Sequence, residues 1–425
     1  MTISGEWERV REPLKNAGPV EIIIGLPTCN DAATAKHVVT SLLAGLGKAC
    51  PEATALLVNA DAGSQDGTPD LVRQTVEEGA SGSPVHHAMV ILQPGALAAR
   101  AIEESGMPGR TQAFQTFFGV ADELNAKACV VVDANLRSVE PEWMDLLLRP
   151  VLDRNADYVS PLFRRPRYDG SLTNSIIYPL SRALYGTRLR YQSGACGLSG
   201  KLAKASLAKG FWEDVHTRFG VDIALATLAV AEGYEVCQVF LGPKIYEGRR
   251  GAGELSEVLG QAVGAVFHFM ETYQEAWENR TGSKPSAAYG SPFEPGEETV
   301  AINVERMLKG FRQGLRDLLP IWKVVLPPET LSKILPLGLV DDEEFRFPAP
   351  LWVQTVYDFA LAYHEQALHQ EHLVKSLTPL YLGRTASLVL ETRDGGSDEV
   401  EQAIEALCQT FERMKPYLID RWRFQ

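Results

Sequence analysis

The fold is constrained most by the way short apolar segments alternate with amphipathic ones in the first half of the chain. Runs rich in β-branched residues predict buried strands, at residues 20–26, 54–59, 86–92 and 129–132. Helical periodicity occupies the stretches between them, at residues 32–46, 69–78 and 111–124. Further strands are expected at residues 157–162 and 236–241, with a helix at 141–153. This order predicts a parallel, doubly wound α/β sheet.

The strand at residues 129–132 ends in a carboxylate, a small residue and an amide, namely Asp133, Ala134 and Asn135. Ligands bind at the carboxyl ends of strands in open α/β sheets. A carboxylate close to a second oxygen donor can hold a divalent cation that keeps its other positions for phosphate and water. The simpler alternative is that Asp133 only opens a loop or caps a turn.

The second half of the chain has a different character. Long helical periodicities are found at residues 255–278, 300–319, 349–373 and 399–417. The chain has 425 residues, which exceeds the size at which a single core stops growing, roughly 250–300 residues. We therefore expect two domains, an α/β domain at residues 1–253 and a helical domain at 254–425.

Composition excludes several classes of protein. The net charge of −13 argues against a nucleic-acid-binding surface. The N-terminus is polar and acidic, and no apolar run reaches the ~20 residues of a spanning helix. The 6 cysteines are scattered without a CxxC pair, so we expect neither disulfides nor a zinc site. These features predict a cytoplasmic protein with no stable membrane insertion.

Three segments, taken in order, resemble the nucleotide-sugar signatures of the GT-A glycosyltransferases. They are residues 27–30 (Pro-Thr-Cys-Asn), 61–68 (Asp-Ala-Gly-Ser-Gln-Asp-Gly-Thr) and 133–135 (Asp-Ala-Asn). The resemblance implies a GT-A fold, which is a doubly wound mixed sheet, here with a helical C-terminal extension. It also implies a donor-nucleotide site that contains Pro27, Thr28, Asp61, Gly63, Ser64, Arg110, Ala134 and Asn135, with Asp61 accepting from the base.

In the same resemblance, Asp133 and Asn135 face Mg²⁺ or Mn²⁺ and the diphosphate. The family's triplet usually ends in Asp, so Asn135 removes a charge and predicts weaker metal affinity. Relatives also place a metal-binding His where this chain has Tyr246. Because Tyr is a poor ligand for these ions, we expect Glu247 to substitute.

Within this family, the chain resembles the glucosyl-3-phosphoglycerate and mannosylglycerate synthases. Their Pro-Gly-Lys stretch corresponds to residues 108–110, where Arg110 is the cation expected to meet phosphate at a helix start. The alternative for Arg110 is an exposed side chain at a helix N-terminus. The resemblance also places Gln192, Gly194, Gly197 and Asp222 around the donor sugar, while Asp222 can equally be a helix N-cap.

The segment from Phe163 to Asn174 combines several arginines with one Asp and one Thr. A guanidinium fork suits a carboxylate, and oxygen partners suit hydroxyls. The resemblance selects Arg165, Asp169 and Thr173 as the acceptor site; a solvated basic turn is the alternative. Relatives that use phosphoglycerate have an Arg where this chain has Ser171, which favours an acceptor without phosphate.

Together these residues predict a retaining, metal-dependent hexosyltransferase in which Asp133, Asp222 and Arg110 act in catalysis. It would move glucose or mannose from a UDP- or GDP-sugar to D-glycerate or a similar hydroxy acid, making a compatible solute or a polysaccharide precursor. A homodimer is also expected. Alternative acceptors are 3-phosphoglycerate, a saccharide or a lipid. A nucleotidyltransferase and a non-catalytic nucleotide-sugar-binding protein are the alternatives from other classes.

Overall fold

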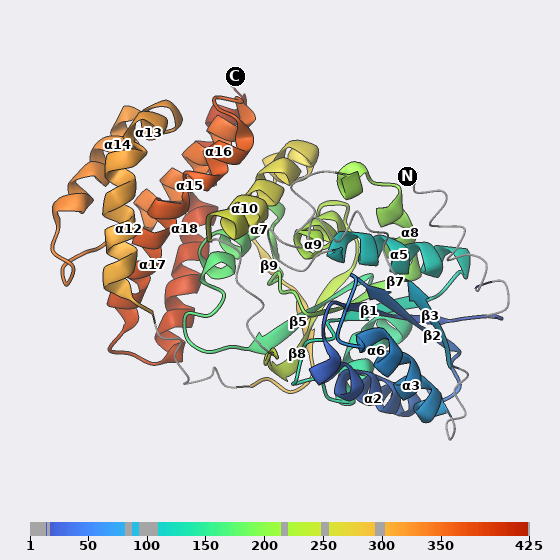
Figure 1. The fold of residues 1–425 in the computed structure, drawn as a ribbon. Coiled ribbons are helices and arrows are strands. Elements are labelled where there is room, and N and C mark those ends of the chain that lie inside the picture. Colours follow the sequence, from blue (N-terminus) through green and yellow to red (C-terminus); the bar gives the residue numbers. More distant parts are fainter. Residues whose placement is uncertain are drawn as a thin grey trace. The chain divides into compact units, whose positions relative to one another are not determined.

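A computed structural model describes Leu14 and residues 18–80, 87–92, 109–213, 220–247, 255–293 and 302–423. The chain divides into two compact units. The α/β unit comprises residues 1–164, 189–253 and 286–293, and the helical unit comprises 165–188, 254–285 and 294–425. Many elements of both units are labelled in Figure 1. The predicted connection before Arg110, at residues 95–108, lies outside the described residues.

Within the described residues, eight strands form one mixed sheet in the order β10-β8-β5-β7-β4-β1-β2-β3. Their bounds are β1 Ile22–Thr28, β2 Ala55–Asp61, β3 His87–Leu92, β4 Ala128–Val132, β5 Tyr158–Arg164, β7 Ala195–Ser199, β8 Val236–Pro243 and β10 Ala287–Tyr289. Neighbouring strands are parallel except where β7 runs antiparallel between β4 and β5. The predicted α/β class is confirmed, although the sequence predicts no strand at β7.

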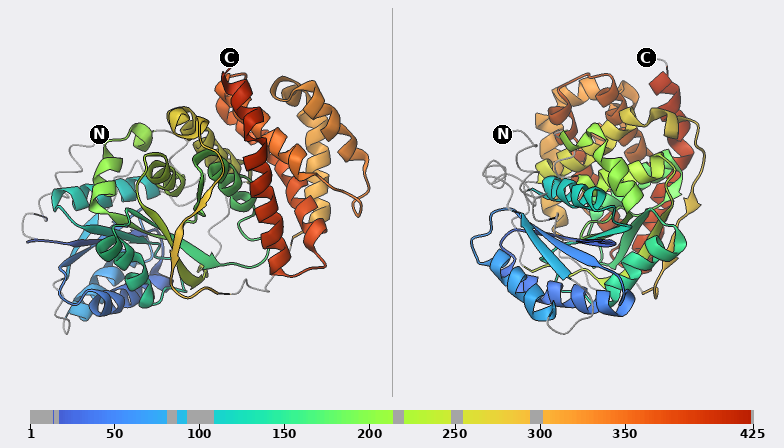
Figure 2. Two further views of the ribbon diagram at one scale, coloured as in Figure 1. Left: turned by 180° about the vertical axis from the view of Figure 1, so that it is seen from behind. Right: turned by 90° about the vertical axis from the view of Figure 1, so that its right-hand side faces the viewer.

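Helices cover both faces of this sheet (Figure 1). One face carries α2 (Ala32–Ala49), α3 (Thr68–Ala80) and α6 (Glu142–Arg154), and the other carries α5 (Arg110–Glu123), α8 (Gly200–Leu207) and α9 (Val221–Ala231). The second view in Figure 2 shows the two helical layers on either side of the strands. Such double coverage explains why the strands are apolar on both faces.

Alternate residues of the central strand pack against each helical layer. Ile22 and Ile24 of β1 contribute to a core with Leu42 of α2. On the other face, the Phe117 ring lies directly over Gly25, where an added Cβ would come within 2.5 Å of the ring. Only glycine therefore lets α5 approach β1 so closely. This close packing sets the position of Arg110, the first residue of α5.

The helical unit consists mainly of antiparallel helices. They are η1 Thr173–Ile177, α7 Tyr178–Tyr185, α10 Leu255–Thr272, α11 Gln274–Glu278, α12 Val304–Asp317, α13 Leu319–Val325, α14 Pro328–Ile334, η4 Leu335–Leu339, α15 Ala349–His364, α16 Gln370–Lys375, α17 Thr378–Thr392 and α18 Ser397–Arg423. A short ladder joins β6 (Thr187–Arg188) to β9 (Lys284–Pro285). The predicted helix at 349–373 is interrupted after His364, where Gln366 adopts a positive φ of 53°. Among the described residues, no helix is long and apolar enough to cross a membrane.

The two units differ from the predicted domains in two segments. Residues 165–188 belong to the helical unit, and residues 286–293, which contain β10, belong to the α/β unit. A single boundary at residue 253 is therefore too simple. The physical reason for the first segment is the packing of α7 on α18, which the sequence places more than 200 residues apart.

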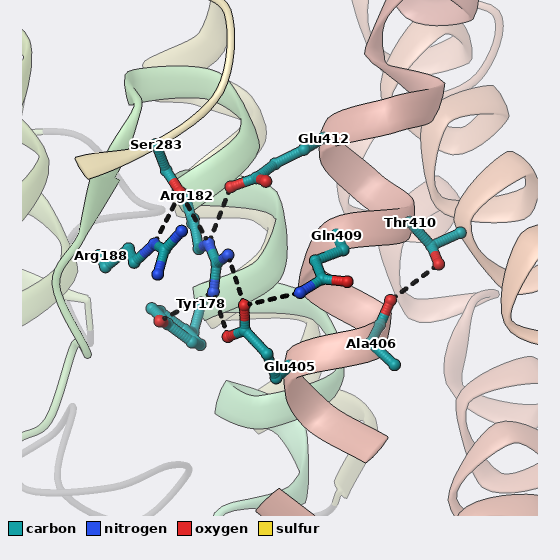
Figure 3. Close-up of polar contacts among 9 residues, drawn as sticks. All are labelled: Tyr178, Arg182, Arg188, Ser283, Glu405, Ala406, Gln409, Thr410 and Glu412. Carbon is teal, nitrogen blue, oxygen red and sulfur yellow. Dashed lines mark hydrogen bonds and ion pairs between the residues drawn. The ribbon is translucent and has the colours of Figure 1, made fainter. Parts of the chain in front are cut away.

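A buried arginine fixes α7 to α18 (Figure 3). The Arg182 side chain is 0% exposed, and its Nη2 and Nε lie 2.8 Å from Glu405 Oε1 and Glu412 Oε1. Burial alone would lower the pKa of Arg182, but hydrogen bonds from both carboxylates raise it. Ser283 Oγ accepts from both Arg182 Nε and Arg188 Nε. These contacts make residues 165–188 an integral part of the helical unit.

Candidate functional site

The carboxyl ends of β1, β2 and β4 lie side by side, because these strands are parallel neighbours. Thr28 and Asp61 occupy paired positions at the ends of β1 and β2, and Asp133 directly follows β4. All three side chains are buried. The tertiary structure thus brings together the strand ends at which the sequence predicts a ligand site.

Asp61 organises the loop that follows β2. Its Oδ2 accepts from the backbone N–H groups of Gly63 and Ser64 at 2.9 and 2.8 Å. Its Oδ1 accepts from the hydroxyls of Thr28 and Ser64 at 2.9 and 2.5 Å. A carboxylate offers about four acceptor positions, so these neighbours saturate it. A base could bind Asp61 only by displacing one of them, and the predicted contact with the base stays a prediction.

The loops after β1 and β2 are joined to each other. The backbone N–H of Asn30 donates to Ser64 Oγ at 2.7 Å, and the N–H of Gln65 returns a bond to Asn30 Oδ1 at 2.9 Å. Asp66 Oδ2 accepts from the N–H of Ala32 at 3.0 Å. Partial burial opposes the effect, but hydrogen bonds from Thr68 and Ala32 lower the pKa of Asp66. The signature residues around Pro27 and Asp61 therefore form one rigid wall of the site.

A cluster of three charged side chains, which we call the Arg110 cluster, lies beside this wall. Arg110 Nη1 donates to Asp133 Oδ1, while Nε and Nη2 bind Asp222 Oδ2 and Oδ1 at 3.1 and 3.0 Å. The three side chains are 8%, 5% and 13% exposed. Burial alone would lower the pKa of Arg110, but Asp133 and Asp222 raise it well above its ordinary value. All three residues predicted to act in catalysis therefore meet in one buried ionic cluster.

Two side-chain oxygen atoms at the end of β4 have the chemistry of ligands for a divalent cation. Asn135 is 6% exposed, and its Oδ1 accepts no hydrogen bond in the part of the chain that the structure describes. A buried, unpaired amide oxygen is unfavourable unless it has another partner, such as a metal ion. Asp133 supplies the anionic oxygen. Mg²⁺ commonly uses one or two such ligands, together with substrate phosphates and water.

Glu247 is less well placed for this role. Its backbone N–H donates to Asn135 O at 2.8 Å, so the chain after β8 does run alongside the metal position. Its carboxylate, however, forms an ion pair with Arg137. No group of three or more His, Cys, Asp or Glu side chains arranged for a metal occurs in the described residues. A metal would thus be held by Asp133 and Asn135, with Glu247 available only after it leaves Arg137.

Lys244 is a cation near the site that the sequence reasoning did not select. Its Nζ donates to Ser193 O and lies 5.0 Å from the ring centroid of Tyr246. An added Cβ on Gly194 would come within 3.1 Å of Lys244 Cε, and Gly194 O accepts from the Asp133 N–H at 2.8 Å. Lys244 follows closely after the strand predicted at residues 236–241. Because ligands bind at strand ends in this fold, this position alone could have indicated a candidate site residue.

The predicted sugar-binding residues occupy different environments. Gln192 Oε1 accepts from the Phe163 N–H at 3.3 Å, and Gly194 adopts a φ of +116°, which favours glycine. Gly197 lies inside β7, where an added Cβ would be 2.5 Å from Leu147 O. Close packing of α6 therefore explains Gly197, and we leave it out of the proposed site.

The predicted acceptor residues all lie in the helical unit. Arg165 Nη1 is 3.8 Å from Asp169 Oδ2. The guanidinium also lies against Gly170, whose φ is +71° and where an added Cβ would be 2.5 Å from Arg165 Nη1. Arg165 Nε has no hydrogen-bond partner in the described structure. Thr173 begins η1. The spacing of four residues does bring Arg165 and Asp169 together, as a hydroxy-acid site would need.

Ser171 forms a hydrogen bond within the helical unit. Its Oγ lies 2.5 Å from the hydroxyl of Tyr381 on α17, and Tyr381 is 4% exposed. Burial raises the pKa of Tyr381. An Arg at position 171 would have to break this hydrogen bond, so Ser171 has a packing role in addition to any influence on acceptor choice.

The sheet order and the double helical coverage define a doubly wound α/β protein. In such folds ligands bind at the carboxyl edge of the sheet, where the candidate residues of this chain lie. The chain is similar to glucosyl-3-phosphoglycerate synthase from Mycobacterium tuberculosis. A structure of that protein with Mn²⁺, UDP and phosphoglyceric acid has 19% identity and a TM-score of 0.42, covering 61% of this chain and 81% of the other. A structure with Mg²⁺ and UDP has 18% identity and a TM-score of 0.42, with 62% and 83% covered.

A further structure of the mycobacterial synthase has 19% identity and a TM-score of 0.40, covering 64% of this chain and 85% of the other. No protein-family model matches the sequence, and no curated protein matches it.

Proposed function

We propose that the chain is a hexosyltransferase that uses a nucleoside diphosphate sugar and a small hydroxy-acid acceptor. The observation that carries the proposal is the Arg110 cluster at the ends of β4 and α9, next to the unpaired Asn135 Oδ1. A diphosphate leaving group needs a cation in the transition state, and a guanidinium binds phosphate oxygens in bidentate fashion. The two signature loops, joined through Asn30 and Ser64, form the wall for the nucleoside.

In the proposed reaction, the bond between the sugar C1 and the diphosphate oxygen breaks while the acceptor hydroxyl oxygen bonds to C1. The hydroxyl proton passes to the departing phosphate. We assign Asp222 to positioning the sugar or the acceptor, because a carboxylate can accept hydrogen bonds from their hydroxyl groups. This assignment suits a retaining transfer in which the acceptor attacks from the face that the diphosphate leaves.

Asp133 and Asn135 would hold Mg²⁺ or Mn²⁺, which supplies Lewis-acid stabilisation of the leaving diphosphate. Arg110 contributes fixed positive charge to the same group. Acceptor recognition falls to Arg165, Asp169 and Thr173 of the helical unit, with the Arg165 guanidinium as the partner of the carboxylate. We assign glycerate as the preferred acid because Ser171 supplies no charge.

The proposal is tested with purified full-length chain, Mg²⁺ and a panel of UDP- and GDP-sugars. We expect release of the nucleoside diphosphate that depends on glycerate, together with a glycosylated product identified by mass spectrometry. Equal amounts of glycerate and 3-phosphoglycerate then compete for one labelled donor, and glycerate should win. Preferential labelling of 3-phosphoglycerate would reverse the acceptor assignment while leaving the donor assignment intact.

The same assay separates the other classes. A nucleotidyltransferase would release pyrophosphate from a nucleoside triphosphate and a sugar phosphate, and it would need a glycine-rich loop after the first strand. The loop after β1 is instead Cys29-Asn30-Asp31, joined to the next loop by hydrogen bonds. A non-catalytic binding protein would bind the donor without turnover under any of these conditions.

A further inference from the structure

The Arg110 cluster has the geometry of an inhibitory contact. Arg110 directs three N–H groups at two carboxylates, and the pair with Asp222 is bidentate. Both carboxylates belong to the proposed machinery, since Asp133 is the anionic metal ligand and Asp222 positions the substrates. With the guanidinium in this place, both oxygens of Asp222 and the Oδ1 of Asp133 are engaged by Arg110.

The charges of the cluster explain why the contact is stable. Two carboxylates that are 5% and 13% exposed would repel each other if no cation lay between them. Arg110 is positively charged at every accessible pH, because a guanidinium is not deprotonated in proteins. A divalent cation on Asp133 would therefore be added beside a guanidinium that already neutralises this oxygen, and like charges in a buried site oppose such binding.

A diphosphate changes this balance. Phosphate oxygens compete for the same guanidinium fork and bring more negative charge than one carboxylate. Once Arg110 binds the diphosphate, Asp133 Oδ1 loses its partner and joins Asn135 Oδ1, which has none among the described residues, as an oxygen donor. Asp222 is released in the same step.

We propose that Arg110 makes metal binding depend on the donor: without a diphosphate it occupies Asp133 and Asp222, and with one it releases both. The inference deepens the proposed function and rests on its donor site. It predicts that Mn²⁺ binds weakly to the free chain and tightly together with UDP. It also predicts that a variant without the guanidinium binds Mn²⁺ in the absence of any nucleotide.

The test measures bound Mn²⁺ from the electron paramagnetic resonance signal of the free ion. The wild-type chain is titrated alone, with UDP, and with uridine, which lacks the phosphates. We expect UDP to lower the apparent Kd of Mn²⁺ by on the order of tenfold or more, and uridine to have no effect. Arg110→Gln should bind Mn²⁺ without nucleotide on the order of tenfold more tightly than the wild type.

Two further variants make the result interpretable. Arg149→Gln removes the same charge from an exposed arginine of α6, which pairs with Asp145 and Asp153, and should leave Mn²⁺ binding unchanged. If Arg110→Gln does not fold because two buried carboxylates repel, the double variant Arg110→Gln/Asp222→Asn removes that repulsion and keeps Asp133. The double variant should also bind Mn²⁺ without nucleotide.

Equal Mn²⁺ affinity of the wild type with and without UDP, when UDP is shown to bind, would overturn the proposal. So would unchanged nucleotide-free Mn²⁺ affinity in whichever Arg110 variant folds. A chain that does not bind UDP at all refutes the proposed donor instead. In that case the comparison of the variants with Mn²⁺ alone still decides whether Arg110 blocks the metal position.

Discussion

At the scale of single residues, Asp61 is a position predicted to bind a ligand whose carboxylate already stabilises the loop around it. Its two oxygens accept from two backbone N–H groups and two hydroxyls, all at the edge of the proposed donor site. Thr28 Oγ1, one of these donors, also accepts from Asn59 Nδ2 at 2.8 Å. A substitution at Asp61 therefore affects the shape of the site as well as any contact with the base.

We predict that Asp61→Ala lowers the free energy of unfolding by roughly 1–3 kcal/mol, because two partly buried N–H groups lose their acceptor. Nucleotide affinity should fall with it. Asp61→Asn retains one oxygen for the two N–H groups and should lose less stability. Urea titrations and UDP binding on both variants check this. An Ala variant with wild-type stability and no UDP binding would show that Asp61 acts through the base alone.

Arg165 is the residue that we propose as the partner of the acceptor carboxylate. We predict that Arg165→Ala raises the KM for glycerate by about 10- to 100-fold, because a charge-assisted contact with a carboxylate is worth roughly 1.5–3 kcal/mol. The KM for the donor should change little. Initial rates with each substrate varied in turn provide the measurement.

A neighbouring arginine supplies the control for this substitution. Arg167 Nη2 donates to Thr392 O at 2.6 Å and to the Tyr168 hydroxyl at 3.0 Å, so it supports the packing of its segment on α17. Arg167→Ala should lower thermal stability without selecting against the acceptor. Equal increases in both KM values for Arg165→Ala would assign Arg165 to the same supporting role.

At the scale of elements, the important contact is that of α7 with α18, since α7 and η1 follow the proposed acceptor segment in the chain. Arg182 is the centre of this contact, and Lys415 of α18 adds hydrogen bonds to Leu184 O at 2.9 Å and Trp277 O at 2.6 Å. We predict that Arg182→Met destabilises the chain by about 3–5 kcal/mol, because the largely buried carboxylate of Glu412 loses its partner.

Hydrogen exchange of residues 165–188 is the appropriate measurement for this variant, since it reports the segment directly. Exchange should accelerate in Arg182→Met, and also in Glu412→Gln, whose side chain is 17% exposed. Glu405→Gln should have a smaller effect, because Glu405 is 41% exposed and solvent screens its charge. An unchanged exchange rate in Arg182→Met would mean that apolar packing alone holds α7 on α18.

At the scale of the whole molecule, stability should depend on pH through a buried carboxyl in the helical unit. Asp358 accepts from Thr330 Oγ1 at 2.6 Å and from the Tyr417 hydroxyl, and burial raises its pKa to about 6. The ordinary pKa of Asp is about 3.9, so the folded chain binds this proton more tightly than the unfolded chain does. The resulting stabilisation is complete below pH ~4 and is lost as the pH rises through ~6.

We predict that Asp358→Asn removes this dependence. The difference in unfolding free energy between wild type and variant should change by roughly 3 kcal/mol from pH 4 to pH 7, since each pKa unit corresponds to about 1.4 kcal/mol. Urea titrations at several pH values measure it. Asp145→Asn, an exposed position on α6, is the control and should show no such window. If the unfolding free energies of wild type and Asp358→Asn changed with pH in the same way, the raised pKa of Asp358 would be contradicted.

The sequence by itself determined the elements that contain the proposed donor site. The alternation of apolar runs and amphipathic segments predicts β1, β2, β4 and the helices between them, because backbone periodicity and burial on both faces leave a local pattern. Polar residues at the ends of those runs predict Thr28, Asp61 and Asp133 at one edge, since parallel strands end together.

Only the tertiary structure decided which of these residues bind one another. Arg110 and Asp222 are 112 positions apart, and no local pattern connects a helix start to a carboxylate at that distance. The insertion of β7 between β4 and β5, the membership of residues 165–188 in the helical unit, and the Ser171–Tyr381 contact are of the same kind. Each depends on packing between segments far apart in the chain, whereas the periodicity of a sequence records only which face of a segment is buried.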